Sequence, residues 1–340
     1  LQSAASEAIA RAVGTEAGCV TGCTAASIAI AVAACMTGRD LGRVEQLPDT
    51  TGMKNEVIMQ KGHELTYGQN VSQNVRLAGA RVVEIGAATQ CGVYQLRHSI
   101  TPNTVAALYV VSPLTVQNRM IDLESFCATC HEHGVPVIVN AASVADPRPY
   151  VKTGADLVLF SAHKAFSSIT AGVIAGRREL VQACIYQGHG IGRPMKVGKE
   201  GVVGVIAALE AWLADDHDAG RRTLSARLAR AKARLDRIAG LSVSVRGHQL
   251  KLEVDPMTAR VSAHSLSKAL FAQDPVIIVW SQFAREGLLF LTLGKVSDEV
   301  ADYVCDRIVE ICAAGTVAEA PAPNIADAIV AQLDDWPLAL

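Results

Sequence analysis

The stretch that decides the fold is Asp156-Leu157-Val158-Leu159-Phe160-Ser161-Ala162-His163-Lys164. Its four consecutive apolar residues, followed at once by polar ones, are typical of a strand buried on both faces of a parallel sheet. Ligands of open α/β sheets bind beyond the carboxyl ends of the strands, so this strand would deliver the amine of Lys164 to a binding crevice. A desolvated lysine amine is the nucleophile that Schiff-base chemistry needs. From this segment alone, an ordinary surface lysine in a loop is an equally good interpretation.

Helix and strand patterns alternate on both sides of this stretch. Further apolar runs of strand length occur at residues 18–22, 57–60, 81–85, 105–111, 135–139 and 171–175. Helical patterns lie between several of them, as at residues 25–37 and 122–133. This alternation predicts an α/β fold in which a mostly parallel sheet lies between helices.

The length of 340 residues favours two domains. We expect a large α/β domain over residues 1–218 and a smaller C-terminal α+β domain over residues 219–315. The expected helices and strands of the smaller domain lie at residues 222–238, 242–245, 250–254, 263–273, 276–280, 288–293 and 298–313. Residues 316–340, which open with Pro321 and Pro323, are expected to form a peripheral tail.

Charge and hydropathy narrow the class of protein. The formal net charge is −2 and no block of Lys and Arg is present, so a nucleic-acid partner is not expected. The longest apolar stretch, residues 25–36, is shorter than the roughly 20 residues that cross a bilayer, so no membrane segment is expected. A composition that is 50% hydrophobic but only 4% aromatic suits a soluble enzyme with closely packed small side chains, which we expect to be cytoplasmic.

Nine cysteines are scattered through apolar segments, and their odd number favours free thiols in a reducing cytosol. Cys127-x-x-Cys130, followed by His131 and His133, has the form of a metal or haem motif. It lies in a helical pattern that ends at a glycine, and no second pair of ligands is nearby, so we expect no metal. The chain starts at Leu1 without an initiator Met, and we expect a natural N-terminal segment to precede it.

Residues able to bind a ligand gather at the predicted strand ends. These positions are Gly22-Cys23-Thr24, His63, Ser112, Asn140-Ala141-Ala142 and Ser161-Ala162-His163-Lys164. The corner at Gly22 leads into the helix of residues 25–37, and a helix N-terminus made of small residues suits a phosphate. A tight turn with an N-cap Thr is the other interpretation. Taken alone, His63 is more typical of a turn residue.

Three motifs carry a resemblance to a known family. They are Ser161-Ala162-His163-Lys164, Thr170-Ala171-Gly172 and Gly192-Arg193-Pro194-Met195-Lys196-Val197-Gly198-Lys199-Glu200. Together they resemble the selenocysteine-synthase-related enzymes that depend on pyridoxal 5'-phosphate (PLP), above all the D-glucosaminate-6-phosphate ammonia-lyase-like members. The resemblance runs from residue 1 to about residue 313. It implies PLP as the cofactor, the fold-type-I transferase architecture with a seven-stranded sheet, and a homodimer or higher homo-oligomer.

The resemblance also implies roles for individual residues. Lys164 would form the Schiff base with the cofactor and then move the proton at the substrate α-carbon, with His63 and His163 as further catalytic residues. The residues that would hold the cofactor are Gly22, Cys23, Thr24, Ser112, Asn140, Ala142, Ser161, His163, Lys164 and Thr170. The residues that would bind an anionic substrate or the phosphate of a neighbouring subunit are Arg193, Lys196 and Lys199. A solvated run of charges is the alternative for this basic set.

The chain departs from the family pattern in places. Where the family carries an aspartate opposite the pyridine nitrogen, this chain has Asn140, which supplies no charge and would make the cofactor a weaker electron sink. Ser167-Ser168-Ile169 stands where relatives usually have Gly-Gly-Pro, so this loop is expected to be stiffer. Arg285 is the nearest candidate for an arginine that binds a substrate carboxylate.

The leading hypothesis is a PLP-dependent lyase of the ammonia-lyase or dehydratase type, acting on an amino acid or amino sugar acid by α-proton removal and β-elimination. Aldol cleavage, racemisation and β-replacement begin with related chemistry and stay open. Selenium transfer to a seryl-tRNA would need a basic surface that the chain lacks. A hydrolase using Ser161 and His163 is disfavoured, because no Gly-x-Ser-x-Gly turn surrounds the serine and side chains two apart at a strand end diverge. A PLP-fold binding or assembly protein, weakened in catalysis by Asn140, is an alternative of another class.

Overall fold

The computed structural model describes residues 1–315, and the tail predicted at residues 316–340 lies outside them. The chain divides after Asp215 into two compact units. The boundary expected after residue 218 lies three residues earlier, because Asp216 is the N-cap of the helix that opens the second unit. No helix in the described part of the chain is long and apolar enough to cross a membrane.

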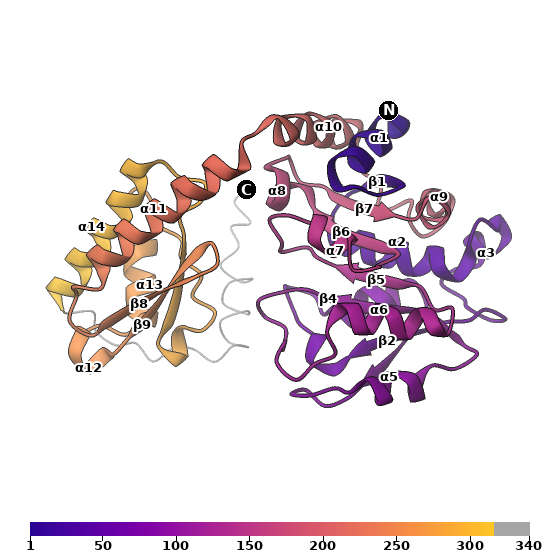
Figure 1. Ribbon diagram of the computed structural model, residues 1–340, viewed down its shortest axis with the longest axis horizontal. Coiled ribbons are helices and arrows are strands. Elements are labelled where there is room, and N and C mark those ends of the chain that lie inside the picture. The colour runs from indigo at the N-terminus through magenta and orange to yellow at the C-terminus, as the bar shows by residue number, and fades with distance from the viewer. Residues whose placement is uncertain (316–340) are drawn as a thin grey trace, which may run out of the picture. The chain divides into compact units, whose positions relative to one another are not determined.

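The first unit contains a seven-stranded sheet in the order β1-β7-β6-β5-β4-β2-β3 (Figure 1). Its strands are β1 (Ala17–Thr21), β2 (Glu56–Gln60), β3 (Arg81–Ile85), β4 (Thr104–Val110), β5 (Val137–Asn140), β6 (Leu157–Ser161) and β7 (Gly172–Gly176). Neighbouring strands are parallel except in the two pairs that involve β7. The predicted α/β fold with a mostly parallel sheet is therefore confirmed. Because β7 alone is reversed, the other strands present their carboxyl ends at one edge of the sheet.

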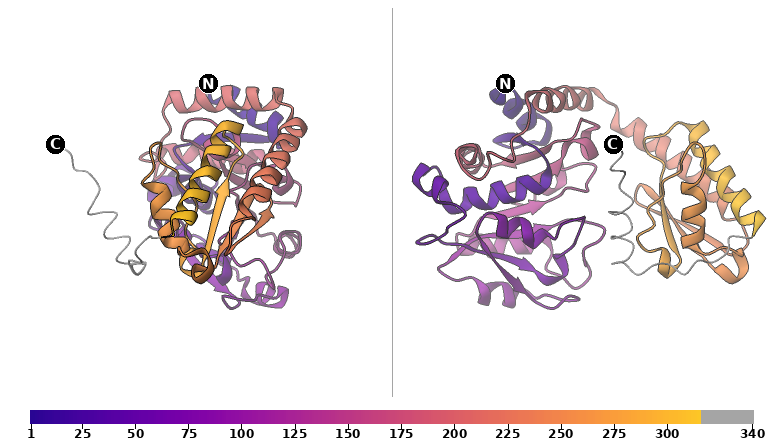
Figure 2. Two further views of the ribbon diagram at one scale, coloured as in Figure 1. Left: turned by 90° about the vertical axis from the view of Figure 1, so that its left-hand side faces the viewer. Right: turned by 180° about the vertical axis from the view of Figure 1, so that it is seen from behind.

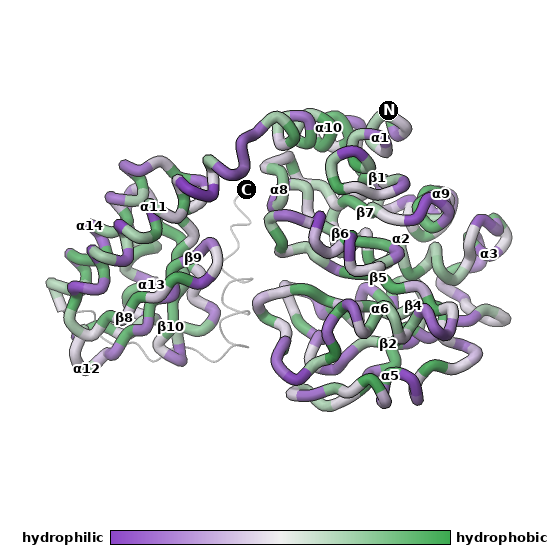
Figure 3. Tube along the Cα trace, viewed as in Figure 1, coloured by the Kyte–Doolittle hydropathy of each residue, from purple (hydrophilic) through white to green (hydrophobic). Residues whose placement is uncertain are grey.

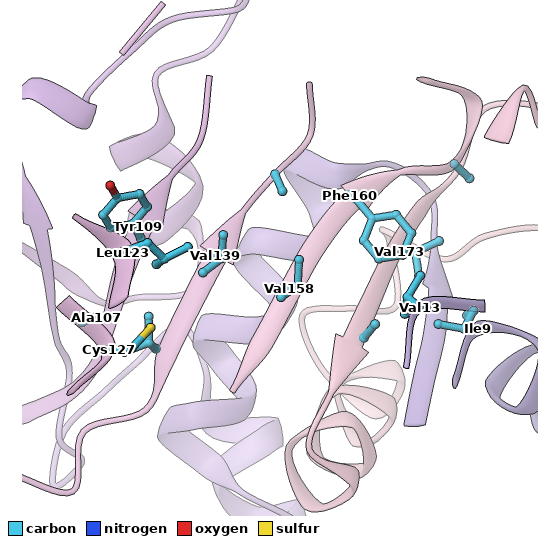
Figure 4. Packing of buried hydrophobic residues seen from close by; sticks show 14 of the residues in the cluster. Ile9, Val13, Ala107, Tyr109, Leu123, Cys127, Val139, Val158, Phe160 and Val173 are labelled. Atoms are coloured by element: carbon cyan, nitrogen blue, oxygen red, sulfur yellow. The ribbon is translucent and has the colours of Figure 1, made fainter. Parts of the chain in front are cut away.

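Helices cover both faces of this sheet. They are α1 (Gln2–Val13), α2 (Thr24–Thr37), α3 (Leu41–Gln46), α4 (Val71–Leu77), α5 (Val93–Ser99), α6 (Leu123–Glu132), α7 (Arg148–Val151), α8 (Ala162–Phe166), α9 (Arg178–Tyr186) and α10 (Lys199–Ala214), with the 3-10 turns η1 (Lys61–His63) and η2 (Gln187–His189). Residues of α1, α6 and α10 share one core with the strands. In this core Leu123 of α6 lies beside Tyr109 and Val139, and Val13 of α1 lies beside Val173 (Figure 4).

The opposite face is covered by α2, α4 and α9. Seen from behind, α2 lies in front of the strands as a long violet helix (Figure 2, right). Its Ala-rich sequence is buried along most of its length, because small side chains allow a helix to lie close to a sheet. Neighbouring strand residues point to opposite faces, so Val139 belongs to the first core and Ile138 to the second.

A buried carboxylate fixes the amino end of β6. Asp156 immediately precedes this strand and is 3% exposed. Its Oδ2 accepts a hydrogen bond from the backbone N–H of Val137 at 2.7 Å and lies 2.8 Å from Nε2 of His131. Its Oδ1 accepts from Nη1 of Arg177 at 3.0 Å. Asp156 therefore joins the start of β5, the end of α6 and the end of β7, at the edge of the sheet opposite to Lys164.

The second unit contains a three-stranded antiparallel sheet in the order β10-β9-β8. Its elements are α11 (His217–Leu235), β8 (Leu241–Arg246), β9 (Gln249–Val254), α12 (Pro256–Ala259), α13 (Ala263–Phe271), η3 (Ala284–Glu286), β10 (Leu288–Thr292) and α14 (Asp298–Ala314). Helices α11 and α14 alternate between hydrophilic purple and hydrophobic green along their length (Figure 3).

The strand predicted at residues 276–280 is wrong. Only Trp280 pairs there, in an isolated bridge to Phe290. The backbone N–H of Ile277 instead donates to the carbonyl of Leu270 at 3.1 Å, at the end of α13. Ile277 and Val279 enter the core of the second unit without strand pairing, whereas Val276 and Ile278 are exposed.

Candidate active site

Lys164 lies in α8, a short helix that begins immediately after β6. Lys164 is exposed, whereas Phe166 in the same helix is buried. The ring of Phe166 meets Phe160 edge-on at 5.6 Å and Trp212 of α10 at 5.0 Å, measured between ring centroids. This packing holds α8 in place, so that Lys164 is presented at the carboxyl edge of the sheet.

Ser161 and His163 come together beside this lysine. Oγ of Ser161 lies 3.0 Å from Nδ1 of His163. The expectation that these side chains diverge is wrong, because the chain leaves the strand at Ser161 and the first turn of α8 brings the two groups to one side. The serine is 4% exposed, whereas His163 is exposed.

Gly172 sets how closely β7 approaches the turn before α2. A Cβ on this glycine would lie 2.4 Å from the carbonyl carbon of Cys23 and 2.5 Å from Oγ1 of Thr21. Those distances leave no space for a side chain, which gives the Thr170-Ala171-Gly172 motif a steric reason. Thr170 itself is exposed just before β7. Because β7 lies between β1 and β6, this contact brings the start of α2 close to the segment that carries Lys164.

The turn between β1 and α2 has the properties of an anion site. Oγ1 of Thr21 lies 2.7 Å from Oγ of Ser27 and donates to the carbonyl of Cys23 at 3.1 Å, which closes the turn. Thr24 is 8% exposed, and its Oγ1 has no hydrogen-bond partner within residues 1–315. A buried hydroxyl without a partner costs about 1–3 kcal/mol, and a helix N-terminus carries partial positive charge. Both features favour a bound phosphate.

Asn140 ends β5 and is 4% exposed. Its Oδ1 accepts a hydrogen bond from the backbone N–H of Ala142 at 3.2 Å. Ser112 follows the neighbouring strand β4, and its Oγ accepts from the N–H of Leu114 at 3.2 Å. Since β4, β5 and β6 are adjacent, the structure places Ser112, Asn140 and Ala142 on strand ends next to the one that carries Lys164.

The structure corrects the position predicted for His63. Its ring is 0% exposed and lies edge-on to Tyr109, with 4.4 Å between the ring centroids. Its Nδ1 accepts a hydrogen bond from the backbone N–H of Val110 at 3.3 Å. Burial lowers the pKa of His63 to about 4, so the ring is neutral at neutral pH. His63 therefore supports the sheet edge from within the core and is not presented with Lys164.

The three predicted anion-binding residues lie in the segment before α10 and at the start of that helix. Arg193 and Lys196 are exposed in the segment before α10, whereas Lys199 is the first residue of that helix. This segment lies against the α2 turn of the same chain, because a Cβ on Gly22 would be 3.1 Å from the backbone oxygen of Met195. The small residue at Gly22 thus lets the basic segment approach the anion site.

Two supporting residues were not predicted from the sequence. Ser27 lies one turn after Thr24 on α2 and contacts Thr21. Gln60 ends β2, is 0% exposed, and binds both the carbonyl and the N–H of Ile121, at 3.3 and 2.9 Å. Gln60 thereby ties the loop after β4 to the sheet. The signal for both was a polar residue inside an apolar segment.

Cys127 and Cys130 face the first core from α6. Burial raises the pKa of each thiol to about 12. Thiolates that bind metals need the opposite environment. Throughout residues 1–315, no group of three or more His, Cys, Asp or Glu side chains is placed to hold a metal ion.

Comparison with known families gives a match over most of the chain. A family model described as SelA, L-seryl-tRNA selenium transferase, matches residues 2–293. The chain belongs to this family.

Curated relatives within the family differ in activity. The 5'-C-glycyluridine monooxygenase-decarboxylase of a Streptomyces species is 37% identical over 92% of this chain and 80% of its own length. The D-glucosaminate-6-phosphate ammonia lyase of Salmonella typhimurium is 38% identical over 71% of this chain and 64% of its own length. The L-seryl-tRNA(Sec) selenium transferase of Haemophilus influenzae is 26% identical over 53% of this chain and 43% of its own length. The chain thus spans less than two thirds of the latter two proteins.

Solved structures also support the assignment of the chain to this family. A structure of D-glucosaminate-6-phosphate ammonia-lyase has a TM-score of 0.78 at 32% identity, covering 92% of this chain and 85% of that one. Serine palmitoyltransferase from Sphingomonas wittichii, with a TM-score of 0.59 at 15% identity over 92% of this chain and 76% of that one, shares the fold alone. These findings confirm the predicted family, the fold-type-I architecture, the PLP cofactor and the enzyme class, and they support the lyase prediction.

The residues of the site fit PLP. The α2 turn offers backbone N–H groups and the buried Oγ1 of Thr24, which suit the phosphate. Lys164 offers a primary amine, which suits the aldehyde. Asn140 offers a neutral amide on the neighbouring strand.

Proposed function

We propose that the chain is a PLP-dependent lyase that acts on an amino acid or amino sugar acid by α-proton removal and elimination of a β-substituent. The observation that carries this proposal is the placement of Lys164 close to the anion site of α2, through the tight contact between Gly172 and the Cys23 turn. An amine and a phosphate cradle are the two groups that hold PLP. Similarity to the D-glucosaminate-6-phosphate ammonia lyase supports a reaction that releases ammonia.

Bound PLP would supply an electron sink for the α-carbon of an amino substrate. Lys164 is the proposed base, because its amine is released when the amino group of the substrate takes its place and can then accept the α-proton. His163, held by Ser161, is proposed to give a proton to the departing β-substituent. For a substrate with a hydroxyl group on the β-carbon, water leaves first. Hydrolysis of the resulting enamine would then yield a 2-oxo acid and ammonia.

The remaining residues are proposed to bind and orient. Gly22, Cys23 and Thr24 would bind the phosphate, and Ser112, Asn140, Ala142, Ser161 and Thr170 would line the cofactor. His63 is proposed to position the strand ends from inside the core. The exposed basic residues Arg193, Lys196 and Lys199 would bind an anionic group of the substrate or the phosphate of a neighbouring subunit.

The proposed activity also implies an oligomeric state, a location in the cell and a type of partner. We propose a homodimer or higher homo-oligomer in the cytoplasm, acting on a small molecule without a nucleic-acid partner. A net charge of −2 and the lack of a basic block support this choice. Aldolase, racemase and β-replacement activities would use the same lysine and are distinguished by product analysis.

A second candidate is oxidative decarboxylation of an amino acid. The observation that favours it is the 37% identity to the monooxygenase-decarboxylase over 92% of this chain. Oxygen uptake and release of carbon dioxide would identify this reaction. An ammonia lyase would instead work equally well under nitrogen.

The test begins with the absorbance spectrum of the purified protein, before and after borohydride, with peptide mass mapping. We expect a visible band that borohydride bleaches and a pyridoxyl mass on Lys164. Lys164→Ala should lose the covalent mass, while the matched control Lys54→Ala, an exposed lysine before β2 at the opposite edge, should keep it. Ammonia and 2-oxo acid are then measured with β-hydroxy amino acids and amino sugar acids.

A protein that takes up no added PLP would overturn the enzyme proposal and favour the binding or assembly protein. A protein that binds PLP on Lys164 but forms other products would keep the cofactor and reassign the reaction.

A further inference from the structure

Three large apolar side chains are exposed together at the end of α13 in the second unit. Phe271 is 62% exposed, Val276 55% and Ile278 80%. The backbone N–H of Ile277 donates to the carbonyl of Leu270, which holds the segment after α13 against the end of this helix. Because Ile277 is buried, its neighbours Val276 and Ile278 point away from the core. Together with Phe271 they form one apolar surface, the α13 patch, and such a group marks an interaction site.

Helix α14 carries the chain to the other end of α13. Oη of Tyr303, near the start of α14, donates to the carbonyl of Asp274 at 3.4 Å, just beyond the end of α13. A Cβ on Gly315, the last described residue, would lie 3.5 Å from Cβ of Arg260, which is two residues before the N-cap of α13. The two helices therefore run antiparallel, and the chain after Gly315 starts beside the amino end of α13.

One face of α13 leads from this point to the patch. His264, Lys268 and Phe271 are spaced by four and three residues, so they share a face of the helix. Nε2 of His264 is buried and has no hydrogen-bond partner within residues 1–315. Burial lowers the pKa of His264, and the positive charges of Lys268 and Arg285 lower it further. This face thus offers an imidazole nitrogen without a partner and two nearby cations, which suit a carboxylate, followed by the apolar patch.

The sequence of residues 316–340 has the matching chemistry. Its charged residues are all acidic, namely Glu319, Asp327, Asp334 and Asp335. Its large apolar residues after Pro323 include Ile325, Ile329, Val330, Leu333 and Trp336. The nine residues of α13 span about 14 Å, a distance that about five residues of extended chain cover. Residues 316–324 are therefore long enough to bring the apolar and acidic part of the tail onto the α13 face.

We propose that residues 325–336 dock on this face of α13 in the same chain. Their apolar side chains cover the α13 patch, and one of their carboxylates lies beside His264 and Lys268. The patch is then covered within one chain, and not by a second copy or by another protein. This contact does not depend on PLP, so it stands or falls separately from the proposed function.

The experiment places the photo-crosslinking amino acid p-benzoylphenylalanine at Ile278 of the full chain. After irradiation a denaturing gel separates crosslinks within one chain, which run as monomer, from crosslinks between chains. We expect peptides from the monomer band that join position 278 to residues 325–336. The matched control carries the same photo-crosslinker at Tyr94, a residue of α5 that is 73% exposed, and should not capture these residues. Lys268→Glu should lower the crosslink yield about two- to fivefold, whereas Lys54→Glu should not.

Fluorescence of Trp336 gives a second measurement that needs no crosslink. Subtracting the emission of Trp336→Phe from that of the wild type isolates this residue. We expect its emission at a shorter wavelength than in a free peptide of residues 316–340, and Ile278→Asp should move it to the wavelength of the peptide. Crosslinks that join two chains, capture at Tyr94 equal to that at Ile278, or wild-type Trp336 emission equal to that of the free peptide would each overturn the proposal.

Discussion

Replacing Thr24 by Val should have opposite effects on the cofactor-free and the PLP-bound protein. Oγ1 of Thr24 is buried without a partner among residues 1–315, and a buried unpaired hydroxyl costs about 1–3 kcal/mol. Val keeps the branched shape and removes this group. We expect the free energy of unfolding of the apoprotein to rise by about 1–2 kcal/mol, which for a unit of this size raises Tm by roughly 2–4 °C per kcal/mol.

In the PLP-bound protein, Thr24→Val should have the opposite effect and remove a stabilising hydrogen bond. With PLP in place the hydroxyl would donate to a charged phosphate oxygen, and such hydrogen bonds contribute about 1.5–3 kcal/mol. Thr24→Val should therefore weaken PLP binding about 10- to 100-fold. Affinity is measured by absorbance titration of the apoprotein, and stability by urea and thermal unfolding.

Thr24→Ser is the matched control, because it keeps the hydroxyl and should keep most of the affinity. Pyridoxal, which lacks the phosphate, should bind wild type and Thr24→Val equally. A Thr24→Val apoprotein that is less stable than wild type and binds PLP with unchanged affinity would refute the phosphate role of this residue.

Three other substitutions test the fold and the core. Asp156→Asn should lower the free energy of unfolding by about 2–4 kcal/mol, because the buried carboxylate loses its charge beside the guanidinium of Arg177, yet leave PLP affinity unchanged at the opposite sheet edge. Gly172→Ala should cost about 1–3 kcal/mol or more and weaken PLP binding, since its Cβ meets the backbone of Cys23, whereas Gly188→Ala, with open space around it, should do neither. Because the pKa of His63 is lowered from 6.5 to about 4 on folding, its neutral form contributes stability that is present above pH 6.5 and lost as pH falls toward 4. Urea unfolding at several pH values gives the free energy of unfolding as a function of pH. Between pH 6.5 and 4 wild type should lose about 3 kcal/mol more than His63→Gln. The same pH dependence in both proteins would contradict the lowered pKa of His63.

Much of the first unit could be predicted because its signals are local. Four apolar residues in a row before Ser161 are enough to identify a strand buried on both faces, and the Ala-rich helix after Gly22 follows from the same kind of pattern. Prediction failed where an apolar segment is buried by something other than strand pairing. In residues 276–280, Ile277 and Val279 are buried and Val276 and Ile278 are exposed, an alternation that no local pattern distinguishes from a strand.

The amino-acid sequence by itself determined the order of helices and strands, the lysine at the end of β6 and the amide in place of a carboxylate at Asn140. Tertiary structure alone decided that His63 is buried, that Gly172 brings the α2 turn close to the lysine segment, and that Oδ1 of Asn140 accepts a hydrogen bond from the backbone N–H of Ala142. The reason is physical: strand and helix preferences act between residues close in the chain. Burial, close contact and the orientation of an amide depend on atoms that only the packed sheet and its helices bring together.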